Sequence, residues 1–209
     1  MKSKNIIILI SLCFGILSCE QDKTESFYCV NTIRNSPATV ILSESELVTI
    51  KSLIDYNRLD FNKYQFFRLQ NDELGYHHVR CNQFVNGLRV FTDDIIFHFD
   101  QNDKYYSLSG DIIEKIDLNT KISMDYDSVV EKFLYLIEQD NTYIGDKKEI
   151  INNCFDLEFG YFDLNAGISY SDENFTKAWK IKPTNRDYPY AYINDENSET
   201  ISYDNGIRY

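Results

Sequence analysis

Glycine and proline are scarce in this sequence, and tryptophan is nearly absent. Only 8 Gly and 3 Pro occur among 209 residues, which excludes collagen-like and proline-rich tracts. A single Trp stands against 16 Tyr and 14 Phe. Because Tyr and Phe suit the half-buried surface of a sheet, this balance favours β structure. With 43% hydrophobic residues, the chain can form a packed core.

Positive charge is also in short supply. Lysine and arginine number 21 against 33 acidic residues, and the formal net charge is −12. A chain this acidic repels the phosphates of nucleic acids and anionic lipid surfaces. We therefore expect no nucleic-acid partner. The acidity itself is typical of a solvated protein surface.

The sequence has no apolar run of about 18 residues, the minimum for a membrane-spanning helix. A shorter apolar run, residues 6–17, follows two lysines and precedes Ser18 and Cys19. A positive start, a short apolar region and a small residue before a cleavage point are typical of an export signal. An ordinary secretory signal that happens to contain a cysteine is one interpretation.

The residues Ile-Leu-Ser-Cys at 16–19 resemble a bacterial lipobox. The resemblance implies that residues 1–18 are a lipoprotein signal peptide, and that Cys19 carries the lipid and anchors the chain in a membrane. Residues 19–42 are then a tether and lead-in. The polar residues 20–23 resemble an acidic surface-routing tether, with a plain linker as the alternative. We expect an exported protein, lipid-anchored in the cell envelope, at the outer membrane or cell surface.

Three cysteines remain after Cys13 leaves with the signal and Cys19 is lipidated. They are Cys29, Cys81 and Cys154, and an odd count permits at most one internal disulfide. The cell envelope allows such a bond. Cys81 lies in a strand-like run, so a possible disulfide between Cys29 and Cys154 is the pairing that we favour.

Hydrophobic periodicity predicts two helices, at 44–56 and 125–139. Ser43 and Glu46 form a capping-box pattern at the start of the first. Alternating residues predict strands, and the dipeptide at 86–87, Asn-Gly, is a strong hairpin signal. The predicted strands span 65–69, 76–85, 88–91, 94–99, 105–109, 155–161, 178–182, 190–193 and 200–203.

The same order of elements occurs twice, one helix and then an antiparallel meander. We therefore predict an α+β protein of two small modules, residues 43–115 and 116–209, each with one helix packed on an antiparallel sheet. The helix covers the apolar face of the sheet, because an isolated hairpin is only marginally stable.

The first module resembles the fungalysin/thermolysin propeptide domain. That family shows a Gly, a His-Val-Arg, a Gln and an Asn-Gly-x-x-Val-Phe turn in this order. The matching residues are Gly75, His78, Val79, Arg80, Gln83, Asn86, Gly87, Val90 and Phe91. The resemblance implies structural roles for these motif residues.

The second module resembles a PepSY domain. Its strand Ala-Trp-Lys-Ile at 178–181, centred on Trp179, and its closing hairpin at 190–201 carry the resemblance. Together the two resemblances cover residues 43–207 and imply cystatin-like/PepSY-like folds. In secreted metallopeptidases these modules form the pro-region, which assists folding of the peptidase and inhibits it. The sequence contains no His-Glu-x-x-His motif that would hold a catalytic zinc.

Catalytic and metal-binding patterns are weak. The three histidines are His77, His78 and His98, and two adjacent residues on a strand point to opposite faces. We expect them to be structural. The segment 195–199 faintly resembles a calcium loop but lacks its central Gly and distal Glu, so we interpret it as a turn. We expect no catalytic residue, metal or cofactor.

Two functions follow from this pattern. The first is a non-catalytic envelope lipoprotein, a propeptide-like module that binds a secreted or envelope metallopeptidase in trans and inhibits or chaperones it. The alternative is an accessory or structural surface lipoprotein of an envelope complex with no link to a peptidase.

Overall fold

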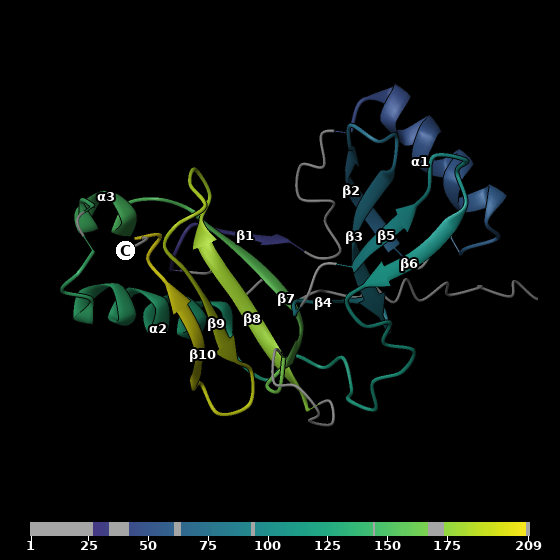
Figure 1. Ribbon diagram of the computed structural model, residues 1–209. Helices are drawn as coiled ribbons and strands as arrows, with labels where there is room; N and C mark the ends of the chain where they lie inside the picture. Colours follow the sequence, from purple (N-terminus) through teal and green to yellow (C-terminus); the bar gives the residue numbers. More distant parts are fainter. Residues whose placement is uncertain are drawn as a thin grey trace, which may run out of the picture.

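Two lobes make up the protein, and each combines a helix with a sheet (Figure 1). The fold is α+β, which confirms the predicted class. The signal segment and Cys19 lie outside the described residues. The computed structural model describes residues 27–33, 42–60, 64–92, 95–143, 145–166 and 174–207.

Helix α1 (Glu44–Tyr56) begins where the capping-box pattern predicted. The Ser43 hydroxyl accepts a hydrogen bond from the backbone N–H of Glu46, and the Glu46 carboxylate accepts one from the backbone N–H of Ser43. Two orphan amides at the helix start are thereby satisfied. The buried stripe of α1 is Ile50, Leu53 and Ile54.

The first sheet is antiparallel and carries α1 on one face. The apolar stripe of the helix packs against inward-facing residues such as Val79, Cys81, Phe97 and Phe99, which form one buried cluster. Alternate residues on the same strands therefore face the other side of the sheet. The strands run in the order β2 (Tyr64–Asn71), β3 (His77–Val85), β5 (Ile95–Phe99) and β6 (Tyr105–Ser109).

The second sheet is covered by α2 (Tyr126–Gln139), which begins at its cap residue Asp125. Its buried residues pack on a core that includes Phe155, Trp179 and Ile181. The four main strands are antiparallel, in the order β10 (Thr200–Asp204), β9 (Tyr190–Asn194), β8 (Phe175–Pro183) and β7 (Phe155–Asp163).

The hairpin between β3 and β4 (Leu88–Val90) joins the two sheets. Asn86 and Gly87 both adopt positive φ, 51° and 77°, as the Asn-Gly signal predicted. β4 then pairs in parallel with β7, with Arg89 opposite Gly160. A ten-stranded sheet therefore runs through both lobes, with β1 and β2 as branches off a path of eight strands.

Gly160 permits this close approach. A Cβ atom at this position would lie 2.4 Å from the carbonyl oxygen of Arg89 and 2.7 Å from the Phe91 ring. A third buried cluster lies at the same junction and consists of Val85, Val90, Ile116 and Tyr161. The two modules thus share a core as well as a sheet.

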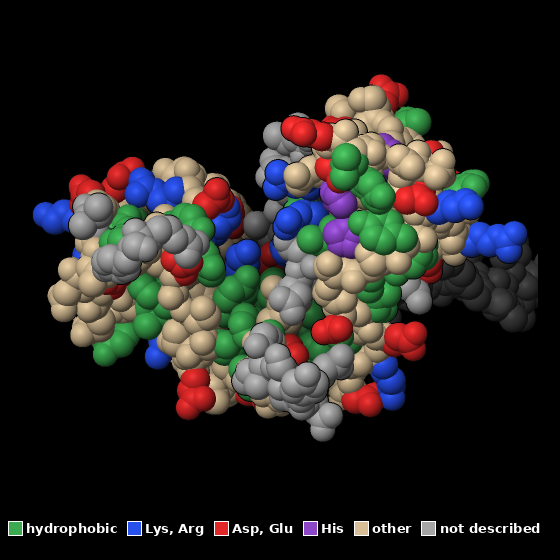
Figure 2. Space-filling model, viewed as in Figure 1, with side chains coloured by type: hydrophobic (Ala, Val, Ile, Leu, Met, Phe, Trp, Pro, Cys, Tyr) green, Lys and Arg blue, Asp and Glu red, His purple; other side chains and the backbone are tan. Residues whose placement is uncertain are grey.

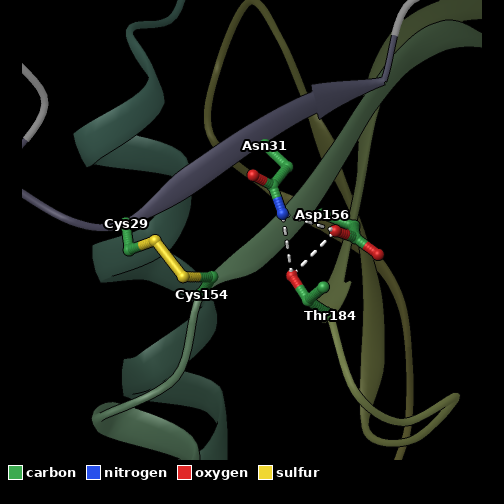
Figure 3. The surroundings of a disulfide bond; sticks show 5 residues. All are labelled: Cys29, Asn31, Cys154, Asp156 and Thr184. Atoms are coloured by element: carbon green, nitrogen blue, oxygen red, sulfur yellow. Dashed lines mark hydrogen bonds between the residues drawn. A yellow bond between two sulfur atoms is a disulfide. The ribbon is translucent and has the colours of Figure 1, made fainter.

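Strand β1 (Val30–Ile33) pairs in parallel with the first residues of β7. Next to it, Cys29 and Cys154 form a disulfide with their Cα atoms 4.5 Å apart (Figure 3). The Asn31 side-chain amide donates hydrogen bonds to Asp156 and Thr184 in the same figure. The start of the described chain is therefore bound to the second lobe.

This strand lies within residues 19–42, which we predicted to be only tether and lead-in. Its four residues are too few to show alternation, and its partner strand is more than a hundred residues away. Residues 29–33 are therefore folded, and this part of the prediction needs correction. The antiparallel prediction also missed the parallel pairings of β1 and β4 with β7.

Helix α3 (Lys147–Ile151) was not predicted, because five residues are too short for a helical period to appear. It adds Ile150 to the core of the second lobe. None of the helices within the described ranges has the length and apolar character needed to cross a membrane.

Candidate functional site

The family-motif residues lie along β3 and β4 and have different surroundings. Val79 is buried in the core of the first module. Val90 is buried in the cluster at the junction between the modules. Gln83 is buried as well, and its side-chain amide donates to the carbonyl of Ile113 at 2.6 Å and accepts from the N–H of Ile113 at 3.2 Å. Gln83 therefore holds the segment that leaves the first sheet.

Trp179 is a core residue, in agreement with its expected structural role. Its ring packs against Phe159 and Tyr126, and its indole N–H donates to the Asp195 carboxylate at 3.0 Å. The segment 195–199 forms the turn between β9 and β10, as we interpreted it. The sequence did not indicate that Asp195, the first residue of this turn, is buried.

Asp195 joins several parts of the second lobe. Its carboxylate accepts hydrogen bonds from the backbone N–H groups of Ser123 and Met124, just before α2. The Lys177 ammonium lies 3.3 Å away, and both side chains are buried. A buried ion pair with several hydrogen bonds holds the start of the helix on the sheet.

The sheet face opposite α1 brings two histidines together. His78 on β3 lies opposite His98 on β5, and their Nδ1 atoms are 2.7 Å apart. His78 Nε2 is 3.6 Å from the Asp72 carboxylate, and His98 Nε2 is 2.9 Å from the Ser109 hydroxyl. His77 points elsewhere, toward Asn71 and Asp103, as expected for adjacent strand residues.

Exposed aromatic and aliphatic side chains surround this histidine pair. The ring of Tyr106 lies 6.0 Å from that of His98 and 5.7 Å from that of Tyr76. Tyr106 is 52% exposed and Leu74 is 72% exposed. Figure 2 shows histidine side chains (purple) beside hydrophobic ones (green) on this lobe. We call the set Leu74, Tyr76, His78, His98 and Tyr106 the aromatic–histidine face.

The histidine pair has a defined electrostatic setting. Partial burial lowers the pKa of His98, and the nearby His78 and Arg80 lower this pKa further. The backbone N–H of Tyr76 is the main cause of a lowered pKa at Asp72. Two Nδ1 atoms at 2.7 Å form one hydrogen bond, with one ring as donor and the other as acceptor, so two doubly protonated rings do not fit this geometry.

The face combines exposed aromatic and aliphatic groups with a histidine pair, a composition that suits binding. Within the described ranges, no three His, Cys, Asp or Glu residues come together in a way that could hold a metal ion. The Cys81 thiol is buried in the core under α1 and contacts the carbonyl of Ile95. Sequence reasoning identified His78 and Arg80 but missed Leu74, Tyr76 and Tyr106. The signal that could have identified these three residues is the presence of apolar side chains just before β3 and on β6.

Comparison with known proteins bears on the segment that carries this face. Residues 69–112 match the family model of the Fungalysin/Thermolysin Propeptide Motif. The match confirms the resemblance on which the first module was recognised. The matched segment includes the whole aromatic–histidine face and Gln83. It covers β3, β4, β5 and β6, together with the end of β2.

Two further comparisons concern the whole chain. No curated protein matches the sequence. A solved structure, the Bacillus megaterium YpeB C-terminal domain, aligns with 78% of this chain at 8% identity and a TM-score of 0.36. The chain spans 65% of that structure's length. The second lobe has the helix-on-sheet layout that the PepSY resemblance implied.

Proposed function

We propose that this protein is a non-catalytic, propeptide-like binding module of the cell envelope, which binds a secreted metallopeptidase in trans and inhibits or chaperones it. The observation that carries the proposal is the propeptide-motif match over residues 69–112. That same segment presents an exposed apolar and aromatic surface. A surface of this kind needs a partner of its own, because isolated soluble proteins expose few such groups together.

The aromatic–histidine face has the composition of a protein-binding surface. Tyrosine is enriched among the residues that contribute most to interface affinity, since it buries a large rigid ring and keeps a polar tip. The rings of Tyr76 and Tyr106 already pack edge to face, which limits the entropy lost when a partner covers them. Leu74, two residues before Tyr76 in the sequence, adds an exposed aliphatic side chain.

The edges of the first sheet offer a second means of contact. Within the described residues, β6 pairs only with β5, and β2 pairs only with β3. Each strand therefore has an edge at which an extended segment of a partner could add by backbone hydrogen bonds. β6 also carries Tyr106, so edge pairing and ring burial can occur in one interface.

Export and lipid anchoring complete the proposal. The lipobox-like residues 16–19 support an anchor at Cys19, at the outer membrane or cell surface. The disulfide between Cys29 and Cys154 also supports an extracytoplasmic location, because structural disulfides persist in oxidising compartments. The tether before Cys29 would leave both lobes accessible to an envelope partner.

A retention experiment tests the binding function. The protein from residue 20 onward is immobilised and exposed to solubilised envelope of its own organism, and retained proteins are identified by mass spectrometry. We expect a metallopeptidase to be enriched and its activity to fall when the protein is added. The double variant Leu74→Glu with Tyr106→Glu should lose this retention, because two charges replace exposed apolar groups on the face.

Tyr135→Glu is the matched control, since Tyr135 is 54% exposed on α2 in the other lobe. It should retain the peptidase as the unchanged protein does. Enrichment of other envelope proteins without a peptidase would contradict the proposal and support an accessory lipoprotein. Equal loss in the control and in the face variant would exclude the aromatic–histidine face as the binding surface.

A further inference from the structure

A charged cavity of about 340 Å³ lies in the second lobe, on the sheet face opposite α2. Its position follows from strand alternation: Phe155, Leu157 and Ile181 face the helix, so their neighbours face away. Figure 2 shows lysine and arginine side chains (blue) at the hollow between the two lobes. The lining residues are Arg89, Asp156, Glu158, Lys180, Lys182, Asp187, Tyr188 and Tyr190.

Lys180 lies opposite Glu158 across the pairing of β7 with β8, so it shares the negative charge of that carboxylate with Arg89. Its ammonium lies 5.6 Å from the ring centroids of both Tyr190 and Tyr192. No hydrogen bond or ion pair connects that ammonium to another side chain of the described ranges, whereas Lys182 pairs with Asp187 at 2.9 Å. Burial, helped by the charge of Arg89, lowers the pKa of Lys180. Lys180 and Arg89 thus share one carboxylate, and this local excess of positive charge at a partly buried place favours an incoming anion.

Arg89 and Glu158 form the second polar element of the cavity. Arg89 Nη1 lies 3.3 Å from Glu158 Oε2, and Glu158 is only 6% exposed. The Arg89 Nε–H and the Glu158 Oε1 are buried without a hydrogen-bond partner. An unused donor and an unused acceptor thus belong to neighbouring side chains. Each destabilises the folded protein while it stays unpaired, because it has lost water without gaining a partner.

The charges of the lining restrict the ligand. Three cationic side chains face three carboxylates, so the lining as a whole is formally neutral. A dianion such as phosphate would meet repulsion from Asp156, Glu158 and Asp187. A single carboxylate that is joined to an N–H donor meets less repulsion. It satisfies the cation and offers a proton to the free carboxylate oxygen.

We propose that this cavity binds the carboxyl-terminal end of a peptide. The terminal carboxylate pairs with Lys180 and Arg89, and the last amide N–H donates to Glu158 after a small rotation of that side chain. The ring of Tyr190 packs against the terminal residue. The size suits a ligand end of this kind, with the rest of the peptide leaving through the open mouth of the cavity. The inference is independent of peptidase binding by the first lobe.

Calorimetric titration of the protein from residue 20 onward tests the proposal. The probes are an acetylated Ala-Ala-Phe peptide with a free carboxyl terminus, the same peptide with an amidated terminus, and an amidated Ala-Glu-Phe peptide. We expect the free acid to bind at least about tenfold more tightly than either amide, since only it places a carboxylate beside an N–H at the chain end. Equal affinity for the free acid and the amidated Glu peptide would overturn the specificity for a terminus.

Variants at Lys180 add a second test. Lys180→Met should weaken binding of the free acid by about tenfold or more, and Lys180→Arg should restore most of it. Lys132→Met is the matched control, because Lys132 also lies over a tyrosine ring but on α2, across the sheet. Unchanged binding by Lys180→Met, or tighter binding of inorganic phosphate than of the free acid, would refute the proposal. The comparison of probes on the unchanged protein remains decisive if a variant fails to fold.

Discussion

At the scale of single residues, the contact between His78 and His98 is the feature most sensitive to pH. The two Nδ1 atoms lie 2.7 Å apart, so one ring donates a hydrogen bond to the other, and two doubly protonated rings could not keep this contact. Burial, then the neighbouring His78 and Arg80, lower the pKa of His98. His98 therefore favours its neutral form in the folded protein.

The sign of the stability effect follows from that lowered pKa. Below the ordinary histidine pKa of about 6.5, the unfolded chain takes up a proton at His98 more readily than the folded chain does. Stability from this residue is thus complete above about pH 6.5 and is lost as the pH falls toward the folded pKa. We expect acidification from pH 7 to pH 5 to lower the Tm.

His98→Gln provides the comparison, because glutamine can still hydrogen-bond to His78 and Ser109 but does not titrate. Thermal unfolding of both proteins at pH 5, 6, 7 and 8 isolates the contribution of this residue. The variant should show the smaller fall in Tm on acidification. Parallel curves for the two proteins would show that His98 does not set the pH response.

At the scale of elements, the disulfide fixes the short strand β1 to the second sheet. Cys29 and Cys154 are separated by 125 positions in the sequence, so the bond closes a very long loop. In the chain-entropy account, a long closed loop restricts the unfolded state most, and measured effects are about 2–4 kcal/mol. The disulfide therefore contributes a large part of the stability of a domain of ordinary size.

Reduction should consequently destabilise the protein by about 2–4 kcal/mol. Denaturant unfolding with and without a reducing agent measures this difference. The double variant Cys29→Ser with Cys154→Ser should resemble the reduced protein and should not respond further to the reducing agent. A remaining response would point to Cys81 or to an intermolecular bond as the source of the effect.

The elements also show what a sequence can and cannot predict. Both long helices and nine strands were predicted close to their observed positions, because their apolar residues repeat with the period of the element. β1 and α3 were missed, since four or five residues carry no period. Long-range pairing is the other limit: the meeting of His78 with His98, or of Trp179 with Asp195, depends on strand register and turn geometry.

The same limit applies to the two candidate sites. The propeptide motif could be recognised from spacing, and Trp179 was correctly predicted to be in the core. The cavity could not be predicted, because Arg89 reaches it only through the parallel pairing of β4 with β7. A site built from strands of both modules becomes visible only when their connection is known.

At the scale of the whole molecule, the junction between lobes determines how the protein unfolds. β4 belongs to the first module in sequence but pairs with the sheet of the second. The buried cluster of Val85, Val90, Ile116 and Tyr161 takes side chains from both modules. Shared sheet and shared core should make the two lobes unfold together, in one transition.

Gly160→Val tests this coupling. A side chain there would meet the carbonyl oxygen of Arg89 at 2.4 Å, so β4 would have to leave β7. We expect a loss of about 3 kcal/mol and two separate calorimetric transitions instead of one. Gly75→Ala is the control, because Gly75 has a positive φ of 82° but an added Cβ there would make only an ordinary 3.8 Å contact with Gln101. That variant should lower stability within a single transition. A single transition in Gly160→Val would mean that the lobes are coupled by β1 and the connecting segment rather than by β4.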